Sequence, residues 1–388
     1  MPSQILHTLF GEDLLAEIRF RIIPELDSGS GKVLDGIWAF QRAAFTLGCQ
    51  GPDIFYHSRG RRPVGLEYGT LLHRRGAGTF SAWLLELALQ KRRQQEGSDA
   101  LVAYALGFMS HAILDRAAHP YIIYKSATSN VFQTASASPR KSETLSAAHS
   151  HTFFERIIDA LMFKLLRGME ISAWDQESLL AEICEKPPFG LQALLEDALV
   201  RAFPERAGKD EKLTKRIENT FHDCAYFYRL TAPAQTSYKK TPPASRPFLL
   251  KKRHLIYLFP EELPCDVDFM NLAKRPWFYP VEDAEGRKED LRSFPELYAD
   301  TVNNAADSLS GIICRYLENN ACQGRGADHY PDNGKHAGAP SLREEIAVAI
   351  GDTGLSIVDK TGKPCAPGRT DPLPLDEVLE TQAVLYGH

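Results

Sequence analysis

Histidines are the residues best suited to chemistry in this 388-residue chain, and seven of the twelve precede residue 152. Two of them, His111 and His119, flank Asp115 at intervals of four residues. On an α-helix this spacing places Asp115 about 40° and His119 about 80° around from His111, so all three side chains project from one side. The surrounding sequence is apolar, and burying a carboxylate with two imidazoles is costly unless a metal compensates. We therefore predict a metal site, although a single His–Asp pair would more simply close a helix end.

A second helical pair, His151 and Glu155, has the same four-residue spacing, which places both side chains on one face. Alone, this pair would equally suit an ion pair at the surface. His149 lies six residues before Glu155, about 240° around a helix, and so fits the same metal less well. We take His151 as the ligand and keep His149 as its alternative.

A further carboxylate, Asp53, follows Gly51-Pro52 in a tight turn, where it is either a ligand or an ordinary turn residue. Two histidines compete for a role beside it. His73 is preferred because its Leu-Leu-His setting suggests a packed element, whereas His57 precedes a run of serine and arginines.

Composition and charge limit the classes of function. The chain is 44% apolar and 24% charged, which is ordinary for a globular protein, and its net charge of −5 argues against nucleic acid as a partner. Its seven scattered cysteines form no C-x-x-C pair and are expected to be reduced. The start of the chain lacks the pattern of a signal peptide, and Glu86 interrupts the best apolar stretch. We expect a cytoplasmic protein without a transmembrane segment.

Helical periodicity dominates the first 320 residues and predicts an all-α, multi-helix bundle. Helices are expected over residues 14–23, 33–45, 99–119, 142–167, 174–185, 190–202 and 211–230. The helix from Asp99 to about His119 is apolar on nearly every side, which predicts a buried, central helix.

The later part of the chain is less regular. Residues 231–290 contain repeated prolines and are expected to form a long irregular excursion from the bundle. Ser293 and Glu296 have the spacing of a capping box, which predicts the start of the last bundle helix. Residues 1–320 are thus expected to form one helical domain, followed by a linker and an unassigned segment over 321–388.

As an ordered set, these residues resemble a known family. The pattern Gly-x-x-x-His-x-x-x-Asp-x-x-x-His-Pro begins at Gly107, is followed by His-x-x-x-Glu, and is preceded by Pro-Asp and a histidine near the N-terminus. It is similar to that of the zinc-dependent phospholipases C of bacteria, which share their fold with single-strand-specific fungal nucleases. The resemblance covers residues 1 to about 170 and implies two or three Zn²⁺ ions in a cleft of an all-α bundle.

The resemblance also implies how the ligands are shared. Asp53, His73, His111 and Asp115 would hold the first zinc; Asp115 and His7 the second; and His119, His151 and Glu155 the third. Secreted members complete the second site with an N-terminal tryptophan, which this chain lacks. Removal of Met1 would instead leave Pro2 five residues ahead of His7, the separation found in the fungal nucleases.

Hydrolysis of a phosphodiester is the reaction that such a ligand set fits best. We expect Asp53 and Asp115 to be catalytic, with Asp53 orienting or deprotonating water and Asp115 bridging two zincs. A phospholipid is the leading substrate, cleaved as by phospholipase C. The alternatives are cleavage as by phospholipase D, a single-strand nuclease, and a zinc-stabilised scaffold without activity. The basic run from Lys251 to His254 is either a solvated edge or a peripheral contact with a membrane surface.

Overall fold

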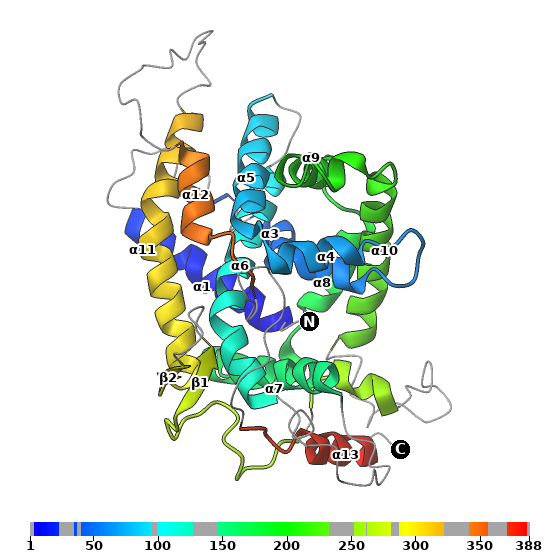
Figure 1. Cartoon of the computed structure of the whole chain (residues 1–388), viewed down its shortest axis with the longest axis vertical. Helices are drawn as coiled ribbons and strands as arrows, with labels where there is room; N and C mark the ends of the chain where they lie inside the picture. The colour runs from blue at the N-terminus through cyan, green and yellow to red at the C-terminus, as the bar shows by residue number, and fades with distance from the viewer. Residues whose placement is uncertain are drawn as a thin grey trace.

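The computed structural model is described over most of its length. The described residues are 4–22, 35–36, 40–94, 99–126, 146–232, 252–260, 262–280, 287–321, 341–355 and 371–385. Over these ranges, the chain is a bundle of α-helices with a single two-stranded sheet (Figure 1). This architecture confirms the predicted all-α fold class. No helix within the same ranges combines the length and the apolar character needed to cross a lipid bilayer.

The long helix α6 (Asp99–Ser126) runs through the middle of the bundle. It contacts α1 (Gln4–Ile22), α3 (Arg42–Cys49), α5 (Ala77–Arg93), α7 (Ala147–Arg167) and α11 (Phe294–Ala321). Because neighbours surround it, apolar residues are buried on every side of α6, as its sequence predicts.

The predicted end of this helix near Pro120 is wrong, since α6 continues to Ser126 with the proline inside it. Proline removes one helical hydrogen bond, and that cost must be offset by packing. Tyr121 supplies part of the offset, because its ring packs edge-on against Trp277 and its hydroxyl donates to the Phe269 carbonyl, 2.8 Å away. These partners are about 150 residues distant in the chain.

A second group of helices covers one side of this core. It comprises η1 (Gly51–His57), α4 (Leu66–Arg74), α8 (Gln176–Glu185), α9 (Leu191–Ala202) and α10 (Leu213–Thr231), together with short 3-10 turns at Ile171–Ala173 and Ala207–Lys209. In Figure 1, α9 and α10 lie together in green on the side away from α11, and α8 packs against α10. Helix α10 packs against η1 and thereby supports the turn that carries Asp53.

The excursion between α10 and α11 contains a 3-10 helix, η7 (Lys252–Tyr257), and a hairpin of β1 (Trp277–Pro280) and β2 (Arg287–Asp290). The strands pair antiparallel, with Trp277 opposite Asp290. The predicted capping box then opens α11, because the Ser293 amide donates to the Glu296 carboxylate at 3.0 Å. Of the basic run, Lys251 lies outside the described residues, as do the side chains of residues 252–254.

Two helices follow in the segment that the sequence leaves without assignment. Helix α12 (Leu342–Ile350) packs against α5 and α11, and α13 (Leu375–Leu385) packs against α7 and η7. Ile346 and Ile350 of α12 are buried in the main core. These parts of the C-terminal segment therefore belong to the same packed unit as the bundle.

Glycines permit the close approach of α3 and α6. A Cβ placed on Gly107 would overlap the carbonyl oxygen of Phe45, and one on Gly48 would overlap that of Tyr104. Both obstacles are backbone atoms, so neither can be moved without shifting a helix. The distance between α3 and α6 is therefore set by these two positions.

We predict that Gly107→Ala destabilises the fold by about 1–3 kcal/mol, because α3 and α6 must move apart. The matched control is Gly311→Ala in α11, where the position is exposed and a Cβ would find its nearest neighbour 3.6 Å away. There the same change should stabilise by about 0.5–1 kcal/mol, through lower entropy of the unfolded chain. Denaturant unfolding measures both, and equal effects at the two positions would contradict the packing argument.

Candidate metal centre

Three groups of potential metal ligands lie on the inner faces of the bundle. The groups are His7, His111 and Asp115; Asp53, His73 and His111; and His119, His151 and Glu155. Within each group, one ligand atom from every residue lies within 4.8 Å of the others. The structure thus brings all eight residues predicted from the sequence into three adjoining groups, and His111 belongs to two of them.

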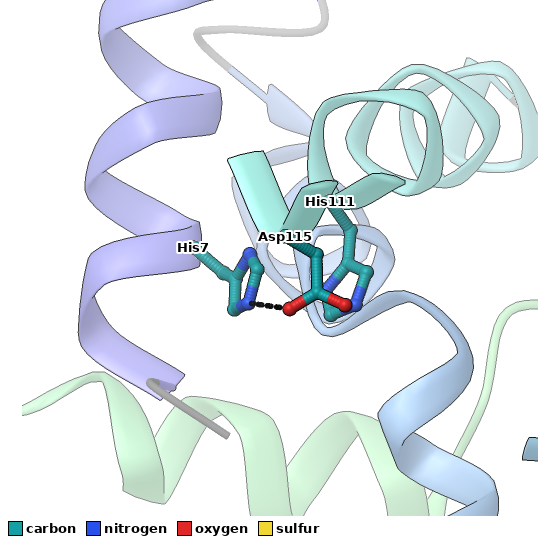
Figure 2. A group of neighbouring side chains, drawn as sticks. All are labelled: His7, His111 and Asp115. Atoms are coloured by element: carbon teal, nitrogen blue, oxygen red, sulfur yellow. Dashed lines mark ion pairs between the residues drawn. The ribbon is translucent and has the colours of Figure 1, made fainter. Parts of the chain in front are cut away.

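The first group joins α1 to α6. Figure 2 shows His7 pointing from α1 toward Asp115 of α6, and His111, also on α6, lies next to Asp115. The Nε2 atom of His7 lies 3.8 Å from Oδ1 of Asp115, and the rings of His7 and His111 stack with centroids 3.9 Å apart. The start of α1 is held by α7, because the Leu6 amide donates to the Asp159 carboxylate at 2.8 Å.

The second group joins η1, α4 and α6. Nε2 of His73 lies 3.1 Å from Oδ1 of Asp53 and 3.7 Å from Oδ2 of Asp115. Nε2 of His111 lies 3.9 Å from Oδ2 of Asp53. All four side chains are buried, so two carboxylates and two imidazoles face one another away from water.

The third group joins α6 to α7. Nε2 of His151 lies 3.0 Å from Oε1 of Glu155, and Nε2 of His119 lies 3.7 Å from the same oxygen. His119 also lies 3.3 Å from Oδ1 of Asp115, so the third group adjoins the first. The alternative histidine, His149, is exposed near the start of α7 and takes no part in these groups.

His57, the alternative to His73, is buried elsewhere. Its ring stacks on Phe227 of α10 with centroids 3.8 Å apart, and burial lowers the pKa of His57 to about 3. It belongs to none of the ligand groups found among the described residues. Of the two histidines, the structure thus places His73 beside Asp53 and His57 beside Phe227.

Backbone carbonyls orient three of the histidines. Nδ1 of His73 donates to Gly69 at 2.7 Å, Nδ1 of His111 to Cys49 at 3.1 Å, and Nδ1 of His119 to Leu355 at 2.9 Å. A carbonyl can only accept, so each Nδ1 carries the hydrogen and each Nε2 faces the carboxylates. Metal-binding histidines are commonly held in this way. Sequence reasoning missed these acceptors because a main-chain carbonyl carries no residue signal.

The donor set fits zinc. Nε2 of His111 and Oδ2 of Asp115 are buried and make no hydrogen bond within the described part of the chain. Leaving such atoms without a partner costs about 1–3 kcal/mol each, which a bound cation would offset. Imidazole nitrogens with carboxylate oxygens are ligands that zinc commonly takes in proteins.

Protonation in the first two groups also suits a dication. Burial lowers the pKa of His7 to about 4 and that of His111 to about 3, so both imidazoles are neutral at pH 7. Burial alone would raise the pKa of Asp53, but His111 and His73 hold it well below its usual value. Neutral imidazoles and ionised carboxylates are the forms that bind metal.

The third group differs in protonation. Burial acts to lower the pKa of His119, but the carboxylates of Asp115 and Glu155 outweigh it and raise the pKa to about 9. In the metal-free protein, Nε2 of His119 therefore carries a second ring proton at pH 7, and the ring is positively charged. A metal must displace that proton to bind here.

Comparison with known families agrees with this geometry. The family model described as zinc-dependent phospholipase C matches residues 6–203, just over half of the chain. No curated protein and no solved structure gives a significant match. The matched residues include all eight members of the three groups.

We predict that Asp115→Asn weakens binding at two metal positions together, because the change removes the negative charge next to both His7 and His73. Changes in outer-shell partners cost about 10 to 100-fold in affinity, and a lost ligand should cost more. Zinc content measured by elemental analysis tests this, with circular dichroism confirming the fold. His149→Ala is the control and should keep its zinc; a full zinc complement in Asp115→Asn would show that this carboxylate is no ligand.

A pH titration should separate the third group from the others. Between pH 6 and 8, displacing the His119 proton should make zinc affinity there rise about tenfold per pH unit. His111 has no proton to lose in this range, so the zinc bound beside it should show a weaker dependence. Competition with a chelator of known protonation measures each affinity, and identical slopes for every zinc would contradict the prediction.

Proposed function

Since this chain belongs to the zinc-dependent phospholipase C family, we propose that it hydrolyses the phosphodiester of a glycerophospholipid, releasing diacylglycerol and a phosphorylated head group. The observation that carries the proposal is the adjacency of three ligand groups around Asp115. A structural zinc is usually enclosed by four protein ligands. A set of adjoining, three-residue groups supports catalysis instead.

Two or three zincs are proposed, shared among the eight residues. Asp53, His73, His111 and Asp115 hold one, Asp115 with His7 a second, and His119, His151 and Glu155 a third. Zinc held in this way supplies a Lewis acid that brings the pKa of water toward neutrality and offsets the charge of a phosphate. Orienting the water, accepting its proton and balancing charge are proposed to depend on protein side chains.

Asp53 is proposed to orient the attacking water and to accept its proton. Its carboxylate is buried and faces two imidazoles, which keep its pKa low and its charge negative. Asp115 is proposed to balance positive charge between the adjoining metal positions, since it lies within 3.8 Å of ring nitrogens from α1, α4 and α6. Neither role requires a serine or cysteine nucleophile.

The substrate is proposed to approach from the side of His151. This side chain is 20% exposed, whereas the other seven ligand residues are at most 10% exposed at their side chains. The third group is therefore the one nearest to solvent. A phosphate entering there would meet His151 and His119 before it reached Asp53.

We predict that zinc-loaded protein releases diacylglycerol from phosphatidylcholine vesicles, and that Asp53→Asn lowers the rate by about 10²–10⁴-fold, as expected for loss of a general base. His149→Ala should keep the rate of the unmodified protein. Phosphatidic acid as the product would indicate cleavage on the other side of the phosphate. Single-stranded DNA tests nuclease activity, and no hydrolysis of any of these by zinc-loaded protein would favour a scaffold.

A further inference from the structure

The loop that follows α12 reaches the metal centre from outside the region matched by the family. Residues 350–355, here called the C-terminal strap, lie more than 140 residues after the end of that match. Leu355 is fully buried, and its backbone contacts two candidate ligands. Its carbonyl accepts from Nδ1 of His119 at 2.9 Å, and its amide donates to the carbonyl of His73 at 2.8 Å.

Arg116 of α6 holds the strap. Its guanidinium donates to the carbonyls of Ile350, Gly351 and Thr353, the last two at 3.1 and 3.2 Å. Arg116 is adjacent to Asp115 and one turn before His119, so it lies on the same helix as these two candidate ligands. A shift of the strap would therefore move the Leu355 carbonyl away from His119.

The start of α5 holds the strap from its other side. The amides of Gly76 and Gly78 donate to the carbonyls of Asp352 and Gly351, both at 3.0 Å. The Asp352 carboxylate accepts from the Thr79 amide at 2.7 Å. A Cβ on Gly78 would overlap the carbonyl of Ala347, so this approach requires glycine. The strap is thus fixed to α4, α5 and α6 together.

The third ligand group depends on the strap more than the second does. His73 and His111 are oriented by carbonyls of Gly69 and Cys49, which lie inside the matched region. Among these three histidines, His119 alone donates to a carbonyl in the C-terminal part of the chain, that of Leu355. Loss of such an acceptor typically costs about 10 to 100-fold in metal affinity.

We propose that the C-terminal strap positions His119 for the third zinc, with Arg116 as the positioning residue that sets the strap. This inference rests on the proposed function, because it assumes that His119 is a zinc ligand. The strap would make the third site conditional on residues about 235 positions away in the sequence. The first and second sites would not share this dependence to the same degree.

The test is a competition titration of zinc from the full-length protein, together with thermal unfolding of the metal-free form. Arg116→Ala should weaken one zinc about 10 to 100-fold and leave the others within about twofold. Arg116→Lys should recover part of the loss, since an ammonium can still donate to these carbonyls. If Arg116→Ala does not fold, Asp352→Ala replaces it. This change removes the carboxylate bond between the strap and α5, leaves the two backbone bonds in place and does not alter α6, so a smaller loss at the same single zinc is expected.

Arg343→Ala is the matched control. Arg343 binds α12 to α5 through Glu86 at 3.1 Å and packs over the ring of Trp83, and both partners lie on α5 and outside the strap. It should lower the stability of the metal-free protein and leave every zinc affinity unchanged. Unchanged zinc binding in Arg116→Ala, or equal weakening of all zincs, would overturn the positioning role while leaving the proposed function standing. A wild-type protein that binds no zinc would overturn both.

Discussion

The arrangement of this protein depends on one buried carboxylate, that of Asp115. Its oxygens lie 3.8 Å from His7, 3.7 Å from His73 and 3.3 Å from His119, so it connects α1, α4 and two turns of α6. A carboxylate removed from water is costly unless positive charge balances it. His7 is neutral at pH 7 because burial lowers its pKa to about 4, and so it supplies little of that balance. In the metal-free protein the protonated His119 supplies positive charge beside Asp115, and a bound metal ion would supply it instead.

The close packing of α3 against α6 serves the same centre. Nδ1 of His111 donates to the Cys49 carbonyl on α3 at 3.1 Å, and this bond orients the ring toward the centre. The glycines at 48 and 107 let α3 lie close enough to α6 for that bond. Because the neighbours of both glycines are backbone atoms, small side-chain movements cannot compensate for a change there. The close packing of α3 on α6 and the orientation of His111 therefore depend on the same two glycines.

The centre also draws on distant parts of the chain. Its candidate ligands span residues 7 to 155, yet the acceptor for His119 comes from Leu355. The match to the zinc-dependent phospholipase C family ends at residue 203, so it contains every candidate ligand but not this supporting carbonyl. A candidate ligand inside the family match can therefore be oriented by a carbonyl that lies outside it. The C-terminal strap supplies this orienting carbonyl to His119.

Periodicity and spacing were enough to predict the helical class and to identify the candidate ligands in their order along the chain. Spacing of four residues is enough to place His111, Asp115 and His119 on one side of a helix, because helix geometry is local. The same reasoning paired His151 with Glu155, and these two side chains lie 3.0 Å apart. Periodicity likewise identified α6 as a central helix, since an element that is apolar on all sides must be surrounded.

Features that depend on partners far away in the chain could be seen only in the fold. The passage of α6 through Pro120 rests on contacts of Tyr121 with residues about 150 positions away. His73 faces Asp53 whereas His57 stacks on Phe227, and the sequence around each histidine hardly distinguishes these positions. The support of His119 by Leu355 was invisible, because every residue has a carbonyl and only the fold determines which one lies within hydrogen-bonding distance.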